Sequence, residues 1–436
     1  MGERVLVVGS GGREHELARQ LDASYDVSEI ICANGNAGTE QLTKAVNVDV
    51  KPTDLDGIYA LAVEREVGLV VVGPEAPLVS GLTARLKVRN IATFGPSAEA
   101  ARLEASKASA TQFMQRHNIP HPTSYIATTP EEAAKFIKKL GSESSVIKAD
   151  GLASGKGVVL PETDQESASV ISRMFSGEGF DGAGKEKVVI QERYHGPEVS
   201  VFVVSDGLVF TVLPFSQDHK RLFKGDRGPN TGGMGAYSPL PDAIIGQAQK
   251  EKVYEIAERT IKGMAREGIY YQGLLYIGLM LAEEEGYDPV VIEYNCRFGD
   301  PETQVVLPVL SEAGVDVYDL LRSAAEGRLR DPKIPIDLGK AALTVCLAAE
   351  GYPSSPQTGE VVHGIDTEYP GVIFHHAGTK KVNDEIVSAG GRVLYVTGIG
   401  NTIDTAAANA YSAIGNGKGY FKGWQYRSDI GHQARS

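Results

Sequence analysis

The sequence predicts a multidomain protein in which an α/β unit is followed by α+β units. Three observations support this fold class. The chain has 436 residues, enough for about three domains at roughly 100 to 200 residues each. Short apolar strands alternate with helical patterns over the first hundred residues, which is typical of parallel βαβ units. Later strands are joined by short turns that contain glycine, which favours antiparallel pairing.

The first unit is predicted from four apolar strands, in the segments RVLVVG, EIICAN, LVVVGP and IATFGP. Helices are expected to begin near Arg13, Asp54 and Pro77. Each strand ends in Gly, Asn or Pro, and an open α/β sheet binds its ligand at the carboxyl ends of its strands. We therefore expect a ligand at this edge of the sheet.

Residues 125–195 predict a small α+β unit. The run from Thr129 to Glu132 has the pattern of a capping box, Pro130 suits the first helical position, and Gly141 suits the end of that helix. The remaining elements of this unit are three strands and a second helix, expected at 144–150, 157–161, 187–192 and 164–175.

Antiparallel patterns follow. The segment VSVFVVSDGLVFTVL predicts two strands joined by a type I′ turn at Asp206-Gly207. A helix near 246–267 precedes strands at 273–281 and 289–295. Residues 328–340 have the composition of a linker, and the remaining residues predict a last α+β unit that ends in a helix.

Composition excludes several classes of protein. An apolar content of 42% and a charged content of 23% are those of a folded globular chain rather than a disordered one. With 43 Lys and Arg against 56 Asp and Glu, the net charge is −13. The chain therefore lacks the basic surface that general binding to nucleic acids or anionic membranes requires. An anionic ligand must be met by local basic groups.

Three cysteines, Cys32, Cys296 and Cys346, stand far apart and lack C-x-x-C spacing. They predict neither a disulfide framework nor a zinc site, and they suit a reducing compartment. The chain begins with the apolar run from Val5 to Val8 without a leader pattern, and no uncharged stretch is long enough to span a bilayer. We therefore expect a soluble cytoplasmic protein.

The loop from Gly9 to His15 joins the first strand to the first helix, where small residues and helix N-terminal amides favour a phosphate. A nicotinamide dinucleotide is the usual ligand of such a loop. However, Glu14 replaces the third glycine of G-x-G-x-x-G, and the second strand lacks an acidic end. A sugar monophosphate held by this loop, by Asn34 to Gly38 and by Gly73 to Glu75 fits better. The alternative is a tight turn without a ligand.

A second glycine-rich loop, from Lys148 to Gly157, joins two strands. It is not a Walker A motif, because that motif leads into a helix. A hairpin flap is expected, in which glycines allow close backbone approach to phosphates and Lys148 and Lys156 supply positive charge. An exposed hairpin with two solvated lysines is the alternative.

The segment VIEYNCRF predicts a strand with one chemical face, because strand side chains alternate. Glu293, Asn295 and Arg297 share this face, and carboxylate and amide oxygens suit Mg²⁺. Arg297 suits two-point binding of a carboxylate. An edge strand with a surface ion pair is the alternative. Asp300 and the proline after it predict the start of a helix with an aspartate cap.

Residues 217–221 and 228–237 are polar and rich in glycine. On residue types alone they are either an ordered active-site loop or a flexible excursion. His219, within the first of them, is either a base or a hydrogen-bonding surface residue.

Seven segments, in order, resemble the glycinamide ribonucleotide synthetase family of ATP-grasp enzymes: GSGGREHEL, NGNAGT, VGPEAPL, KADGLASGKG, QDHKR, GPNTGGMGAYSP and VIEYNCRFGDPETQ. The likeness covers nearly the whole chain. It implies ligation of glycine to 5-phosphoribosylamine with ATP, through a glycyl phosphate, in the second step of purine synthesis. It also implies Mg²⁺ or Mn²⁺, small-molecule substrates only and a monomer.

The same resemblance implies four domains or subdomains. These are a Rossmann-like substrate domain at 1–105, an ATP-grasp core at 106–124 and 196–330, an inserted lid at 125–195, and a C-terminal α+β domain at 335–436.

Roles are implied residue by residue. The implied metal ligands are Glu293 and Asn295. The implied catalytic residues are Arg297, Lys148 and Lys156. The implied nucleotide-binding residues are Lys107, Lys148, Gly155, Lys156, Gly157, Glu192, Arg193, Tyr194 and Glu198. The implied residues for glycine and phosphoribosylamine are Gly11, Gly12, Asn36, Gly38, Glu75, Asp218 and Arg297.

Three alternatives stay open at this point. Another carboxylate–amine ligase or a carboxylase of the same fold would not need both glycine and phosphoribosylamine to release phosphate. A non-catalytic nucleotide sensor would keep its nucleotide response in Glu293→Ala. A dehydrogenase would bind NADH tightly.

Overall fold

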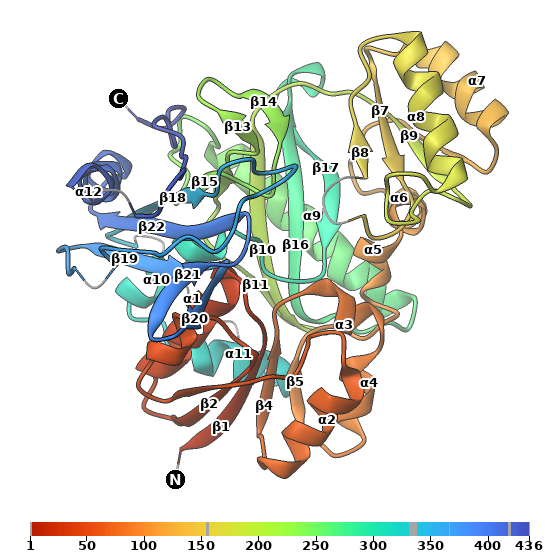
Figure 1. The fold of residues 1–436 in the computed structure, drawn as a ribbon. Coiled ribbons are helices and arrows are strands. Elements are labelled where there is room, and N and C mark those ends of the chain that lie inside the picture. The colour runs from red at the N-terminus through yellow and green to blue at the C-terminus, as the bar shows by residue number, and fades with distance from the viewer. Residues whose placement is uncertain (1, 154–156, 331–337, 366, 417–419, 436) are drawn as a thin grey trace.

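The computed structural model describes residues 2–153, 157–330, 338–365, 367–416 and 420–435. Figure 1 shows the N-terminal unit at the bottom, the C-terminal unit at the upper left and a small unit that projects at the upper right. The long strands of a central sheet run between them. The described residues include no helix that is both long and apolar enough to cross a membrane.

The N-terminal unit is a five-stranded parallel sheet in the order β3-β2-β1-β4-β5. This confirms the predicted βαβ pattern, and the residues of β1 from Val5 to Val8 are fully buried because helices cover both faces. The short strand β3 was not predicted. The elements are β1 Glu3–Gly9, α1 Gly12–Ala23, β2 Val27–Asn34, η1 Thr39–Gln41, β3 Ala45–Val48, α2 Leu55–Glu64, β4 Leu69–Val72, α3 Glu75–Val79, α4 Leu82–Lys87 and β5 Ala92–Phe94.

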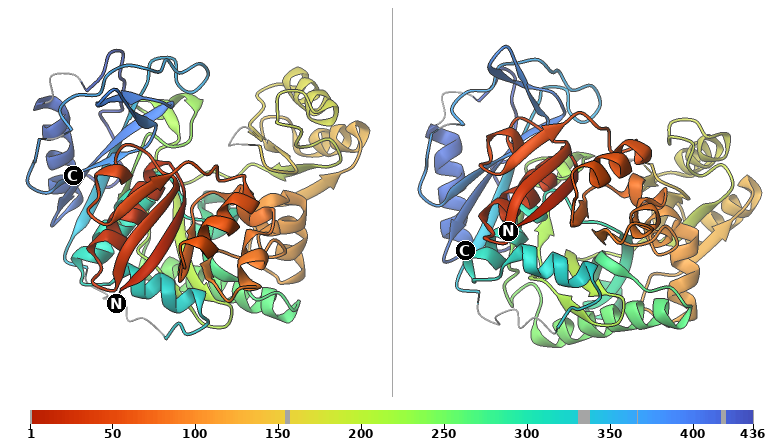
Figure 2. Two further views of the ribbon diagram at one scale, coloured as in Figure 1. Left: turned by 60° about the horizontal axis from the view of Figure 1, so that its bottom comes forward. Right: turned by 90° about the horizontal axis from the view of Figure 1, so that it is seen from below.

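Two helices, α5 Arg102–Ala105 and α6 Lys107–Arg116, lead into the small projecting unit. This unit is a four-stranded sheet in the order β6-β9-β7-β8 with α7 and α8 on one side. It has its own apolar core, and Figure 2 shows it standing away from the rest of the molecule. Its elements are β6 Ser124–Ala127, α7 Pro130–Leu140, β7 Ser145–Ala149, β8 Val158–Val159, α8 Asp164–Ser176 and β9 Val188–Glu192.

The N-terminus of α7 differs in one detail from the predicted capping box. The Thr129 hydroxyl accepts the N–H of Glu132 at 3.2 Å, as expected. The Glu132 carboxylate, however, accepts the N–H of Thr128 at 2.8 Å, one residue before the cap. Gly141 has φ of +91° at the C-terminus of the helix, which suits glycine.

The central sheet is antiparallel, in the order β11-β10-β16-β17. The predicted hairpin is present, but its turn type was wrong. The loop is longer because Ser205 pairs with Phe210, and of the predicted pair only Gly207 has positive φ. The Asp206 carboxylate instead accepts two N–H groups of the loop, at 2.9 and 2.8 Å. The elements are β10 Glu198–Asp206, β11 Phe210–Val212, α9 Gln247–Arg266, β16 Gln272–Ala282, η2 Glu283–Glu285 and β17 Asp288–Asn295.

The last sheet joins segments that are far apart in sequence. Its order is β12-β15-β18-β22-β19, so β12 and β15, from residues 217–238, join strands beyond residue 340 through the pairing of β15 with β18. The polar segment is therefore ordered. Two separate two-stranded sheets, β13-β14 and β20-β21, accompany it. The elements of both parts are β12 Gln217–Asp218, β13 Arg221–Phe223, β14 Arg227–Asn230, β15 Gly235–Ser238, β18 Ala341–Ala348, β19 Val372–His376, β20 Thr379–Val382, β21 Glu385–Ser388, β22 Arg392–Gly400 and α12 Ile403–Asn416.

The helix after the central sheet, α10 Thr303–Glu312, begins later than predicted, and α11 Val317–Ala325 follows it. Glu302 is the N-cap residue rather than Asp300. The Asp300 carboxylate has other partners: Nε2 of Gln304 at 2.7 Å and Nη2 of Arg392 at 3.5 Å. Contact with the C-terminal sheet thus takes the side chain away from the helix cap. The proposed domain boundaries remain predictions.

Candidate active site

Strand β17 presents Glu293 and Asn295 on one face, as its alternation predicts. Tyr294 and Cys296 point the other way and are 3% and 1% exposed. Glu293 lies opposite Gly278 of β16, where an added Cβ would come within 2.7 Å of Glu293 Cγ. A glycine in the neighbouring strand therefore makes room for the carboxylate.

The ammonium of Lys220 lies among three carboxylates. Its Nζ is 3.5 Å from Asp218, 3.8 Å from Glu293 and 4.0 Å from Glu198. Burial opposes its charge, but these carboxylates outweigh burial and raise the pKa of Lys220 well above its usual value. The pKa of Glu293 is lowered, because Lys220 and other nearby cations outweigh its desolvation. Three strands, β10, β12 and β17, thus converge on one charged cluster.

Lysine 220 was missed at the sequence level, although the alternation of Asp218 and Lys220 indicates that they share a face. Asp218 and Glu198, both predicted site residues, are brought to this cluster. Desolvation and the neighbouring carboxylates raise the pKa of Glu198, with Lys220 opposing them.

Two further predicted lysines border the cluster. Nζ of Lys148 donates to the carbonyl of Ile292 at 2.8 Å, and Nζ of Lys107 donates to the carbonyl of Gly151 at 3.0 Å. Burial lowers the pKa of Lys148 to about 8, with Glu293 acting in the opposite direction. Burial also lowers the pKa of Lys107. The structure therefore brings Lys107 and Lys148, two of the predicted phosphate-binding lysines, beside the predicted metal ligands.

The predicted flap is described only in part. Gly155 and Lys156 lie outside the described residues. Gly157 is buried, and its carbonyl accepts the N–H of Ala149 at 2.8 Å. The flap thus starts and ends on the paired strands β7 and β8.

The predicted adenine hinge follows β9. The N–H groups of Glu192 and Arg193 each donate, at 2.8 Å, to carbonyls in the segments that precede β6 and β7. The hydroxyl of Tyr194 donates to Glu285 at 3.2 Å. These two N–H groups are used inside the protein, so a base at this hinge would be bound by other groups of the segment.

The first glycine loop is shaped by Glu14, which is 2% exposed. Its Oε2 accepts the N–H of Gly11 at 2.6 Å, and its Oε1 accepts Nε of Arg13 at 2.6 Å. A Cβ at Gly9 or Gly73 would come within 2.6 or 2.0 Å of this side chain. Gly9 and Gly73, which lie in two different loops, therefore leave space for Glu14.

The loop from Asn34 to Gly38 is fixed by Asn36, which is 6% exposed. Its Nδ2 donates to the carbonyls of Ser10 at 2.9 Å and His376 at 3.0 Å. Its Oδ1 accepts the N–H groups of Gly38 at 2.8 Å and Thr39 at 3.1 Å. Both ends of the amide are thus engaged in holding the loops together, and a ligand would meet the loop through other atoms.

Arg297 joins the glycine loops to the central sheet. Its Nε lies 3.2 Å from Glu75, and its Nη2 lies 3.1 Å from Glu104. Glu104 is 8% exposed and also accepts the N–H of Cys296 at 2.7 Å. Burial raises the pKa of Glu104, with Arg297 opposing it. The sequence reasoning missed Glu104, because it stands in an ordinary helical pattern without a distinguishing motif.

His219 is buried rather than at the surface. It is 1% exposed, and its Nε2 accepts the N–H of Gly431 at 3.1 Å. Burial lowers its pKa to about 4. The expectation of a surface histidine was wrong because the C-terminal segment, distant in sequence, covers it.

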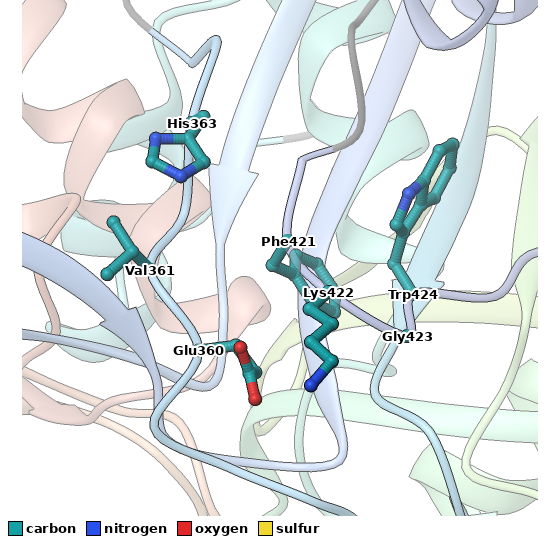
Figure 3. Close-up of a pocket in the computed structure, with 7 residues that line it drawn as sticks. All are labelled: Glu360, Val361, His363, Phe421, Lys422, Gly423 and Trp424. Carbon is teal, nitrogen blue, oxygen red and sulfur yellow. The ribbon is translucent and has the colours of Figure 1, made fainter.

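Two cavities lie in or beside the C-terminal unit. One, of about 540 Å³, lies between the segment Asn34–Ala37 and the β20–β21 hairpin, and includes Asn36 and Thr379 in its lining. The other, of about 440 Å³, is lined by residues from 360–363 and 421–424, as Figure 3 shows. No predicted site residue lines this second cavity.

Comparison with protein families decides the relationship. Three family models match in sequence order: the phosphoribosylglycinamide synthetase N domain at residues 3–104, its ATP-grasp (A) domain at 105–303 and its C domain at 342–433. The chain belongs to the phosphoribosylglycinamide synthetase family. The resemblance found in the sequence motifs is thereby confirmed.

Relatives of the chain include a phosphoribosylamine–glycine ligase of Xanthomonas axonopodis pv. citri. It is 43% identical over 432 residues, which are 99% of this chain and 98% of the relative. The human trifunctional purine biosynthetic protein adenosine-3 is 41% identical over the whole chain, which spans 42% of that protein.

Solved structures support the same relationship. The crystal structure of a phosphoribosylamine–glycine ligase from Thermotoga maritima matches with a TM-score of 0.84 and 35% identity, covering 98% of this chain and 100% of that one. A biotin carboxylase domain from Hydrogenobacter thermophilus, crystallised with MgADP, matches with a TM-score of 0.74 at 17% identity, over 98% of this chain and 92% of that one. The family member described here therefore has the predicted ATP-grasp fold with N-terminal and C-terminal domains.

Proposed function

We propose that the chain ligates glycine to 5-phosphoribosylamine at the expense of ATP, giving glycinamide ribonucleotide, ADP and phosphate. The observation that carries this proposal is the likeness to phosphoribosylamine–glycine ligases along the full chain. The geometry supports it, because Arg297, beside the candidate ATP site, reaches Glu75 of the candidate phosphoribosylamine loops at 3.2 Å. The reaction is the second step of purine synthesis.

In the first step, a carboxylate oxygen of glycine attacks the γ-phosphorus of ATP. The bond to the ADP oxygen breaks, and glycyl phosphate forms. This step concentrates negative charge, so positive groups around the transferred phosphoryl group lower its barrier. Lys148 and Lys107 border the cluster that holds Glu293, and we assign them to the nucleotide phosphates.

In the second step, the amine of phosphoribosylamine attacks the carbonyl carbon of glycyl phosphate. Phosphate leaves with the bonding electron pair, and the new amide nitrogen loses a proton. We assign Arg297 to orienting the glycyl carboxyl group, Asp218 to the glycine amine, and Gly11, Gly12 and Gly38 to the ribose phosphate. Closure of the flap over the site would keep water from the acyl phosphate.

Glu293 and Asn295 suit a divalent cation. Both offer oxygen donors on one face of β17. Lys220 lies 3.8 Å from Glu293, which shows that this cluster of carboxylates already attracts a positive group. The described residues hold no group of three or more His, Cys, Asp and Glu side chains arranged for a metal. Phosphate and water oxygens would thus complete the shell, as is usual for Mg²⁺. When bound, Mg²⁺ or Mn²⁺ would neutralise charge on the phosphates.

The decisive experiment is a coupled assay for ADP with each substrate omitted in turn. ADP formation should require glycine and phosphoribosylamine together, with glycinamide ribonucleotide detected by mass. ADP formation with another acid or amine, but not with this pair, would assign the site to a different ligase. Binding of ATP without turnover would indicate a nucleotide sensor.

Further properties belong to the same proposal. The enzyme acts as a monomer in the cytoplasm, and sedimentation velocity checks the monomer. The domain boundaries proposed above place an inserted lid at residues 125–195. Limited proteolysis checks these boundaries, and cleavage only within the proposed lid would contradict them.

A further inference from the structure

Two buried histidines connect the C-terminal unit to two loops of the candidate phosphoribosylamine site. These two glycine loops are the first, from Gly9 to His15, and the second, from Asn34 to Gly38. His15 lies in the first turns of α1 and is 5% exposed, while His376 ends β19 and is 3% exposed. The N–H of His376 donates to Nδ1 of His15 at 2.9 Å. Their rings meet edge to face, with centroids 5.5 Å apart. A contact between residues 361 positions apart thus holds the start of α1.

His376 also contacts the second glycine loop, through Asn36. The carbonyl of His376 accepts Nδ2 of Asn36 at 3.0 Å, and this Nδ2 also donates to Ser10 of the first loop at 2.9 Å. The His376 ring packs against Gly38, where an added Cβ would come within 2.6 Å of the His376 Cγ. The ring is itself held by Thr379, with Nδ1 and Oγ1 3.0 Å apart. His376 therefore contacts both glycine loops.

A neighbouring contact holds α1 against β19. Nε2 of His375 lies 2.7 Å from Glu16, whose carboxylate is also bound by Nε of Arg19 at 2.7 Å. Both His375 and Glu16 are fully buried. The helix cannot shift along the strand without breaking these contacts.

The tautomer of His15 follows from its partner. A backbone N–H can only donate, so Nδ1 of His15 must be unprotonated and Nε2 must carry the proton. Burial and the two neighbouring imidazoles lower the pKa of His15 well below its usual value, which keeps the ring neutral. The contact between His15 and His376 therefore persists at neutral pH.

We propose that His15 and His376 are positioning residues for phosphoribosylamine, which hold the two glycine loops at the separation that the ribose phosphate requires. This inference rests on the proposed function. Neither side chain is assigned to the reacting atoms. The cavity of about 540 Å³ that Asn36 and Thr379 line opens beside the pair.

The test compares three variants of the full chain. His15→Leu removes the acceptor and puts an apolar side chain of similar size in its place. His15→Asn restores an acceptor, because Oδ1 of asparagine can take the place of Nδ1. His363→Leu is the matched control, since His363 is an exposed histidine of the C-terminal unit. Rates are measured in the reverse direction from glycinamide ribonucleotide, ADP and phosphate, because phosphoribosylamine is a hemiaminal that hydrolyses in water.

In His15→Leu, the KM for glycinamide ribonucleotide should rise about tenfold, which corresponds to about 1.4 kcal/mol, within the range for leaving a buried N–H unpaired. The KM for ADP should stay within about twofold. His15→Asn should recover most of the loss, and His363→Leu should match the wild type. An unchanged ribonucleotide KM, an equal rise in every KM, or no recovery in His15→Asn would each overturn the proposal.

If His15→Leu does not fold, His376→Ala takes its place, because this substitution removes the ring that packs against Gly38. The same selective rise in ribonucleotide KM is expected, and its absence overturns the proposal. A wild-type chain without turnover would contradict the proposed function instead. Calorimetric titration with ribose 5-phosphate would then still test the positioning role of His15 and His376. Weaker binding than in the wild type is expected in His376→Ala, and equal binding would overturn the proposal.

Discussion

Lys148 provides a pH test of the candidate phosphate site. Lys148 is 8% exposed, and burial lowers its pKa to about 8 in the ligand-free protein, with Glu293 opposing the shift. A lysine attracts phosphate only in its charged form, which exists below its pKa. The charged fraction falls from about nine-tenths at pH 7 to about one-tenth at pH 9, so capture of ATP should fall roughly tenfold across this interval.

The assay is kcat/KM for ATP between pH 6.5 and 10, since this parameter reports ionisations of the free enzyme. The wild type should show an alkaline limb with a midpoint of about pH 8. Lys148→Arg should lack this limb, because arginine stays charged at every pH of the assay. Lys139→Arg, on the exposed face of α7, is the matched control and should keep it. A flat wild-type profile, or the same limb in Lys148→Arg, would refute the assignment.

Three further predictions address the site and its support. Glu293→Ala should lower ADP formation at least about 100-fold with little change in Tm, because it removes a predicted metal ligand; near-normal activity would contradict the metal assignment. Arg297→Leu should destabilise the protein by about 2 to 4 kcal/mol in guanidinium titrations, because the buried Glu104 is left without its cationic partner; an unchanged midpoint would contradict this prediction. The pKa of Glu16 is lowered to about 2, because Arg19 and His375 outweigh its desolvation. Its carboxylate should therefore contribute about 3 kcal/mol above pH 4.5 that is lost as the pH falls toward 2. In Glu16→Gln, Tm should fall less steeply between pH 4.5 and pH 2 than in the wild type. An equally steep fall of Tm in both proteins would contradict this prediction.

Local patterns in the sequence were enough to predict several parts of the site. The alternation of Glu293 and Asn295 with buried neighbours follows from strand geometry alone. The parallel βαβ pattern of the first sheet and the long helix α9 follow from hydrophobic periodicity. In each case, the information lies within a few residues, because backbone geometry fixes which side chains share a face.

Partners across the molecule were not predictable in this way. Lys220 sits among carboxylates from three strands, and Glu104 reaches Arg297 from a helix 193 positions away. His219 is buried because the C-terminal segment covers it.

Residue types at short spacing were enough to predict the fold class, the family and the chemical character of the glycine loops and of β17. Which charges meet, the place of strands β12 and β15 in the C-terminal sheet, and the contact of His376 with both glycine loops came only from the folded chain. Such contacts arise because whole sheets and helices pack together, and no local spacing encodes their relative placement.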